Sequence, residues 1–230
     1  AKLRAAVGTD DHAAWFAHVS LWGTFFEYYL RRLEIAAQMS ELVSPHKDIV
    51  SRGGSLPAEV RTQLIALHRE AYELADAYDK QAADVPGNMM AQVRAHGMTK
   101  PYREWMASFD FSLDAALPVK QFSADMEADP PVLKAGQPFA VPVLLRNTGM
   151  CPWLPEIDFS LNVGGDAARL GIPASTPMGG EPVVFGEERG IELRGTAPSD
   201  PGQCDVELRF RFTCRTHDPV ASKKITLRWE

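Results

Sequence analysis

The sequence predicts an α+β protein whose helices and strands occupy separate segments, with a bundle of three to four helices over residues 1–118 and an antiparallel β-sandwich over residues 119–230. Two observations carry this prediction. Before Pro118, apolar residues recur at steps of three and four, the period of an α-helix, and after it they recur at steps of two, the period of a β-strand. The chain has 230 residues, which is enough for two ordinary domains.

The first predicted helix begins at Asp10 or Asp11, because either residue is a suitable N-cap. Its apolar residues form one helical stripe, and further aromatic residues make this stripe wider than a normal single face. Such a helix is expected to lie at the centre of its domain or to be covered by a partner. The stripe consists of Trp15, Val19, Trp22, Phe26, Tyr29, Leu33 and Ala36, and it is widened by Phe16, Phe25 and Tyr28.

Three further helices are predicted after a break at the Gly53-Gly54 pair. Pro57 and Glu59 favour the start of a second helix over residues 57–80, and shorter helices are expected over residues 86–97 and 99–109. Short connections between helices are typical of an antiparallel bundle. The apolar stripe of the second helix consists of Val60, Leu64, Leu67, Ala71, Leu74 and Tyr78.

The second half of the chain contains about seven segments with strand periodicity. Each long segment has one apolar and one polar face, as two antiparallel sheets packed on each other require. No helical pattern interrupts them, so we expect an immunoglobulin-like β-sandwich. The join over residues 109–122 is apolar, which predicts a rigid dock with Phe111, Leu113 and Leu117 in the seam. The segments are residues 122–126, 139–146, 157–163, 183–185, 191–194, 204–214 and 224–230.

The stretch RNTGMCPWLP, residues 146–155, predicts a structural corner. Asn147 and Gly149 accept the positive φ of a sharp reversal, and Trp153 is expected to fold back as a plug over the end of the core. Cys151 lacks a histidine partner that would make it a nucleophile. The long Gly- and Pro-rich segment over residues 164–182 is either a binding loop or packs on the helical domain, and we favour packing.

Two stretches, LKAGQPFAVPVLLRNTGMCPW and TAPSDPGQCDVELRF, resemble the four-tryptophan (FW) domain and its bacterial relatives. The resemblance extends from Pro131 to Trp229. Trp153, after the NTG turn, matches one signature tryptophan, whereas Val143 and Val163 stand where two others are expected. The resemblance implies an immunoglobulin-like fold and a non-catalytic role in protein interaction.

Charge and hydropathy exclude two classes of function. A net charge of -6 argues against a general nucleic-acid binder, and no apolar run approaches the ~20 residues that cross a bilayer. In RFRFTCR, alternation places Arg209 and Arg211 outside the core, as a basic stripe that can meet an acidic partner. The compartment is not indicated: a soluble chain, either cytoplasmic or processed and extracytoplasmic, fits the sequence.

Three cysteines are too few for a disulfide scaffold. Cys204 and Cys214 bracket one predicted strand and would be ~33 Å apart, which excludes a bond between them. Cys151 could pair with either one, or all three could be free buried thiols, which is the interpretation that we favour.

No catalytic constellation can be assembled, and neither a metal nor a cofactor is expected, because the chain has no Glu-X-X-His repeat and no i, i+4 histidine pair. The main hypothesis is a non-catalytic interaction or accessory module that binds another protein chain, a further domain of a larger complex or a second copy of itself. The alternative is the C-terminal portion or a small subunit of a larger enzyme, for example a carbohydrate-active one. The predicted contact residues are Trp15, Trp22, Phe25, Tyr28, Arg209 and Arg211.

Overall fold

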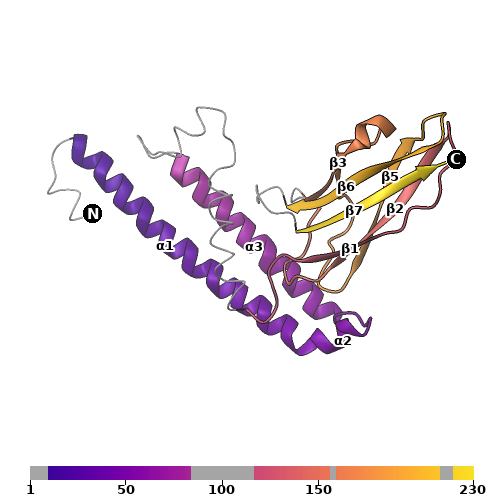
Figure 1. Ribbon diagram of the computed structural model, residues 1–230. Helices are drawn as coiled ribbons and strands as arrows, with labels where there is room; N and C mark the ends of the chain where they lie inside the picture. Colours follow the sequence, from indigo (N-terminus) through magenta and orange to yellow (C-terminus); the bar gives the residue numbers. More distant parts are fainter. Residues whose placement is uncertain (1–9, 84–116, 156–158, 213–219) are drawn as a thin grey trace.

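The computed structural model describes residues 10–83, 117–155, 159–212 and 220–230. Helix α1 (Asp10–Val43) and helix α3 (Ala58–Ala83) run in opposite directions and form a long hairpin, closed by a 3₁₀ turn (Ser44–His46) and the short helix α2 (Lys47–Ser51). Two antiparallel sheets follow, and the closed end of the hairpin lies beside them (Figure 1).

The predicted bundle of three to four helices is wrong. The described residues contain two long helices and the five-residue α2, and they form a hairpin instead of a bundle. The hairpin closes its core against the sheets, because Val43, Val50 and Leu64 belong to the same apolar cluster as Phe122 and Val143. Helical periodicity marks a helix but does not show what the helix packs on. The helices expected over residues 86–97 and 99–109 lie outside the described residues.

Helix α1 buries a different face from the one its apolar stripe predicts. The buried apolar positions are Tyr28, Ile35, Ala36, Met39 and Val43, on the helix that packs against α3. From the predicted stripe, Val19 and Phe26 are exposed, at 47% and 58% of their surface, and Ala36 is buried. Because α1 is apolar on several sides, its sequence lacks a polar face that would mark the outside.

Helix α3 buries the face that its sequence predicts. Leu64, Ala71 and Tyr78 are buried, and Val60, Leu67 and Leu74 pack against the same core. None of the helices in the described ranges has the length and apolarity to span a membrane.

Seven described strands form the two sheets. One sheet has the order β1-β2-β5 and the other the order β4-β3-β6-β7, and every pairing is antiparallel. These sheets are compatible with the β-sandwich part of the prediction. The strand bounds are β1 Ala124–Ala128, β2 Pro138–Asn147, β3 Phe159–Gly165, β4 Ser175–Pro177, β5 Glu188–Thr196, β6 Gly202–Phe212 and β7 Ala221–Trp229.

Two details of the strand prediction change. Residues 183–185 form no strand and make one isolated bridge, between Val183 and Trp153. The segment over residues 164–182 contains a 3₁₀ helix (Asp166–Leu170) and strand β4, and it packs chiefly on strands β3 and β6. It therefore covers the sandwich itself, and contact with the hairpin is made at Pro182, whose carbonyl accepts a hydrogen bond from Arg61.

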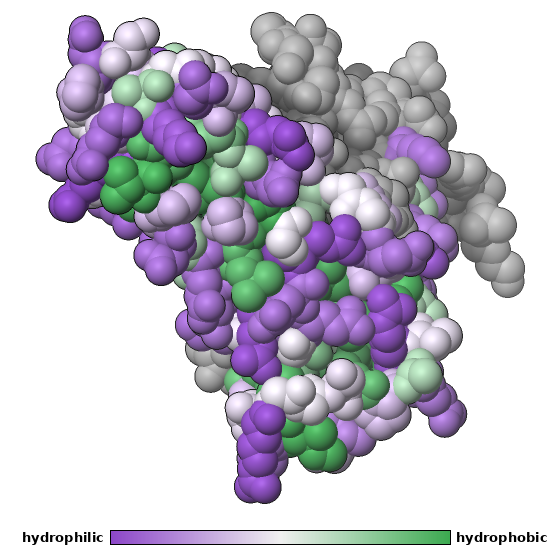
Figure 2. Space-filling view, turned by 90° about the vertical axis from the view of Figure 1, so that its right-hand side faces the viewer, coloured by the Kyte–Doolittle hydropathy of each residue, from purple (hydrophilic) through white to green (hydrophobic). Residues whose placement is uncertain are grey.

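The seam between hairpin and sheets is apolar in the middle. Val119 and Phe122 are buried there, and Leu117 packs against the core as predicted, whereas Phe111 and Leu113 lie outside the described residues. Seen from the side of the sheets, the surface has hydrophobic residues in several separate groups among hydrophilic ones (Figure 2).

Candidate functional site

The corner after β2 is organised by the buried amide of Asn147. Its Nδ2 donates to the carbonyl oxygens of Cys151 and Val183, at 3.0 and 2.9 Å, and its Oδ1 accepts from the N–H of Gly149 at 2.9 Å. Asn147 is fully buried, so all three bonds are shielded from water. One side chain thus ties the turn to the segment that precedes β5.

Gly149 and Trp153 complete this corner, but the predicted positive φ is wrong. No non-glycine residue in the described ranges has a positive φ, and Gly149 is not among the glycines that do. Glycine is needed because a Cβ atom would stand 2.6 Å from the carbonyl oxygen of Gln121. Trp153 is 1% exposed and lies 4.7 Å, centroid to centroid, from the ring of Phe210, so it does plug the core.

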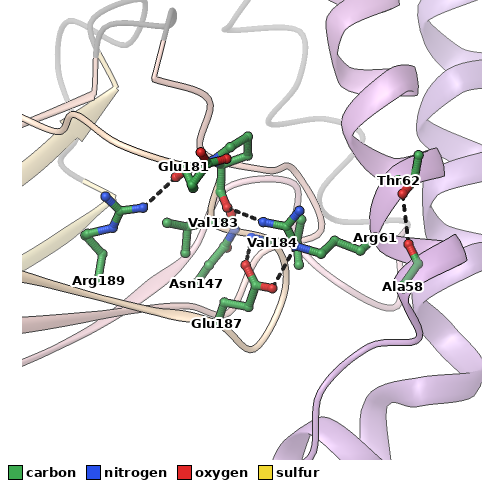
Figure 3. A network of polar contacts seen from close by, with 10 residues as sticks. Ala58, Arg61, Thr62, Asn147, Glu181, Val183, Val184, Glu187 and Arg189 are labelled. Atoms are coloured by element: carbon green, nitrogen blue, oxygen red, sulfur yellow. Dashed lines mark hydrogen bonds and ion pairs between the residues drawn. The ribbon is translucent and has the colours of Figure 1, made fainter.

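An ion pair joins this corner to the hairpin. Arg61 Nε, on α3, donates to Glu187 Oε1 at 2.9 Å, and Arg61 Nη2 donates to the carbonyl oxygen of Pro182 at 2.8 Å (Figure 3). The other carboxylate oxygen of Glu187 accepts the N–H of Val184 at 3.0 Å. The backbone of Glu187 in turn accepts from the N–H of Asn147. Helix α3 is therefore connected to the end of β2 through one glutamate.

The tip of the hairpin fits closely against the same loop. Gly186 has φ 86°, and the side chain of Val50, on α2, fills the space where a Cβ atom on Gly186 would lie. Arg146 Nη2 donates to the carbonyl oxygen of Val50 at 2.7 Å, and Lys47 Nζ donates to that of Pro118 at 2.8 Å. These contacts fix the direction in which the hairpin leaves the sheets.

A hollow of about 490 Å³ lies at this junction, and its walls come from the Gly53–Ser55 loop, α3 and the segment before β5. Three arginines line it, and each already binds protein acceptors: Arg61 and Arg146 as described, and Arg189 the carbonyl oxygens of Gly179 and Glu181. The charges of the hollow thus serve to hold loops together.

His68 is a buried polar residue in the seam. Its side chain is 3% exposed, its ring lies 6.0 Å from that of Phe122 in an edge-on arrangement, and its Nε2 has no hydrogen-bond partner. Burial, together with the positive charge of Arg32, lowers the pKa of the His68 imidazole to about 3. At neutral pH His68 is therefore an uncharged packing residue.

The predicted contact residues of α1 are not brought together in one place. Tyr28 is 5% exposed, and its ring stacks on that of Tyr78 at 5.6 Å, within the hairpin. Trp15, Trp22 and Phe25 lie on α1, but their side chains are outside the described part of the structure. Exposed apolar side chains do occur on this helix, at Val19, Phe26 and Leu30, with 47%, 58% and 58% of their surface accessible.

The two predicted arginines lie on β6, as alternation with the buried Phe210 requires. Arg209 Nη2 donates to Glu207 Oε2 at 2.6 Å, and this bond lowers the pKa of the Glu207 carboxyl. Arg211 is partly buried, and its Nε has no hydrogen-bond partner. The basic stripe is thus partly neutralised by its own strand.

Among the described residues, no three His, Cys, Asp or Glu side chains are placed to hold a metal ion. Cys151 and Cys204 are buried thiols that form no disulfide, and Cys214 lies outside the described residues. Burial raises the pKa of the Cys204 thiol, the opposite of the shift that activates a nucleophile.

Comparisons with known proteins find likenesses among solved structures alone. No family model and no curated protein matches the chain. A β-glucosidase from Listeria innocua, solved alone and in complex with glucose, is similar to part of it, with 14% sequence identity and a TM-score of 0.28. The match covers 47% of this chain and 16% of the β-glucosidase chain, and it supports no inference at this TM-score.

Sequence reasoning missed the residues that join hairpin and sheets. Glu187 looks like part of a solvated, charged turn, and Arg61 like one charge among several on the wet face of α3. Arg61 and Glu187 are 126 residues apart in the chain, so no local sequence pattern relates them. The contact between Gly186 and Val50 could not be predicted either. A glycine in the sequence indicates a position of unusual backbone conformation or close packing, but it does not indicate which residue packs there.

Proposed function

We propose that this chain is a non-catalytic interaction or accessory module, in which the helical hairpin is a rigid arm that binds another protein chain through the outer face of α1. One observation carries the proposal: large apolar side chains on α1 stay exposed on the side that faces away from the hairpin core. We call Val19, Phe26 and Leu30 the outer row.

The outer row has helical spacing. Its members are seven and four residues apart, so they share one side of α1, while Tyr28, Ile35 and Met39 occupy the opposite side. Single exposed apolar residues are ordinary on protein surfaces. A row at i, i+7 and i+11 on one helix face is instead the pattern by which an amphipathic helix binds an apolar groove or another helix.

The seam supports the same proposal. An arm can present a surface to a partner with little loss of entropy when its base is held by several independent contacts. Three such contacts are present, made by Lys47 on α2, Arg61 on α3 and Arg146 on β2.

Site-specific photo-cross-linking in the source cells tests the proposal. A benzoyl-phenylalanine placed at Phe26 or Leu30 is expected to form a covalent product with one defined protein, identified by mass spectrometry. Val132, 60% exposed on the sheet side, is the matched control position and should give no such product. Absence of a product at positions 26 and 30, or the same product at 132, contradicts the proposal.

A second measurement uses the purified pair. The double substitution F26E/L30E is expected to weaken binding of the identified protein at least about tenfold, because it places charges in an apolar contact. V132E should leave binding unchanged. Equal affinities for the two variants would exclude the outer row as the binding surface.

A further inference from the structure

We propose that the free edge of strand β5 pairs with the β5 edge of a second copy of this chain, in an antiparallel arrangement about Ile191, and so forms a symmetric dimer. This surface lies on the sheets and is independent of the outer row of α1.

Strand β5 is the longest open edge among the described strands. It has nine residues, and β2 is its one neighbour within its sheet. Strand β7 is an edge of the other sheet, and its end is bridged to Leu133, whose backbone forms hydrogen bonds with Arg228 and Glu230. Strand β4 is three residues long, and β1 is five. An open edge of this length offers a row of backbone donors and acceptors to another strand.

The hydrogen-bond pattern shows which residues of β5 face this edge. At one end of the β2–β5 ladder the N–H of Asn147 donates to the oxygen of Glu187, and at the other the N–H of Ala197 donates to that of Gln137. Glu187 and Ala197 flank β5 at its two ends and are both odd-numbered, so the odd-numbered residues of β5 form the hydrogen bonds to β2. By alternation, the backbone groups of the even positions point away from β2: Glu188, Gly190, Glu192 and Arg194.

Those four positions are also exposed, and the charges of Glu188, Glu192 and Arg194 select one register. In an antiparallel pair about Ile191, Glu188 stands opposite Arg194 of the second copy, twice by symmetry, and Gly190 stands opposite Glu192. A slip of two residues in either direction places glutamates directly opposite each other, which is unfavourable. Charged side chains on an edge strand usually prevent pairing with another strand, but in this register those of the two copies are complementary.

The surroundings leave room beside the edge. A hollow of about 710 Å³ runs along residues 190–194, with Ile172, Pro173 and Thr176 on its other wall and Pro142 at its side. Glu192 and Arg194 keep 54% and 75% of their side-chain surface exposed, although they form an ion pair with each other. A strand-to-strand contact of this length is small, so the dimer is expected to be concentration-dependent.

Sedimentation velocity of the purified chain between about 1 µM and about 1 mM tests the dimer, since small interfaces give weak association. The expected result is reversible dimerisation in this range. E188R and R194E should each weaken it at least about tenfold, and E127R, with the same charge change on strand β1 of the same sheet, should leave it intact. A chain that stays monomeric throughout overturns the proposal.

Mixing the two variants tests the register. An E188R chain carries arginine at 188 and 194, whereas an R194E chain carries glutamate at both, so the two chains are complementary and should form a mixed dimer. Circular dichroism and thermal melting of each variant alone verify that it is folded. Failure of two folded variants to associate when mixed, or a dimer insensitive to E188R, would show that the predicted pairing does not occur.

Discussion

The side chain of Val50, at the tip of the helical hairpin, occupies the space that a Cβ atom on Gly186 would fill, beside the loop that leads into β5. Since Gly186 also has φ 86°, two separate requirements favour glycine there. Together with the Arg146 bond to the Val50 carbonyl, this contact holds the hairpin at a defined angle to the sheets.

Replacing Gly186 with alanine is therefore expected to destabilise the protein by more than its backbone strain alone. Gly171 is the matched control, because it has φ 66° but no atom lies within 4 Å of the position that a Cβ would occupy. G171A should cost about 1–2 kcal/mol from φ alone. G186A should cost about 1–3 kcal/mol more, because Val50 must move. Urea unfolding of both variants measures the difference, and V50A/G186A should recover part of it. Equal costs for the two glycines would refute the close fit.

The ion pair between Arg61 and Glu187 should contribute modestly to stability. Both side chains are about one-third exposed, so a double-mutant cycle of R61M and E187Q is expected to give a coupling energy of about 0.5–1 kcal/mol. The i, i+3 pair Arg31–Glu34, more exposed, is the comparison and should give a smaller coupling energy. A coupling at the seam no larger than this would show that the pair does not help to hold the hairpin.

Stability should fall in mild acid because of His68. Its pKa is about 3 in the folded protein and about 6.5 in the unfolded chain, so the unfolded state binds more protons between these values. The contribution of the neutral ring is fully present above pH 6.5 and is lost as pH falls toward 3. At pH 5 the loss is about 2 kcal/mol.

The variant H68L isolates this effect, since leucine does not titrate. The unfolding free energy of the parent minus that of H68L, measured from pH 7.5 to 4.5, should decrease as pH falls. Parallel curves for the two proteins would mean that His68 becomes protonated without cost.

Removing the Asn147 amide should be costly because the carbonyl oxygens of Cys151 and Val183 each lose a donor, although that of Val183 keeps the N–H of Trp153. N147A is expected to destabilise the protein by about 2–4 kcal/mol. N147D should be worse at pH 7, because its carboxylate would face those oxygens, and its pKa in the folded state would be raised. Its extra penalty should therefore vanish as pH falls through the unfolded value of about 3.9. If the difference between N147D and N147A is the same at pH 7 and pH 4, the described bonding is wrong.

Much of the strand arrangement can be predicted from the sequence. Segments 139–146, 204–214 and 224–230 coincide closely with β2, β6 and β7, because one face of each is buried and period two is then unavoidable. Strand β4 was hidden within a Gly- and Pro-rich segment, since three residues carry no measurable period. The α3 face was equally readable, because its charged residues mark the solvent side.

The candidate sites were less predictable. The aromatic residues of α1 predict a contact surface on this helix, which stays a prediction, and one of them, Tyr28, packs on Tyr78 within the hairpin. Trp153 and Asn147 were recognisable from the turn that contains them, although the need for Gly149 comes from a neighbouring backbone and not from its φ.

The amino-acid order alone determined where helix gives way to strand and which side of each strand is apolar, because these depend on neighbours a few residues apart. The tertiary structure decided that two long helices form a hairpin closed against the sheets, which side of α1 remains exposed, and that Arg61 meets Glu187. Such outcomes depend on contacts between residues distant in the chain. These contacts stabilise the protein only once the whole molecule has packed.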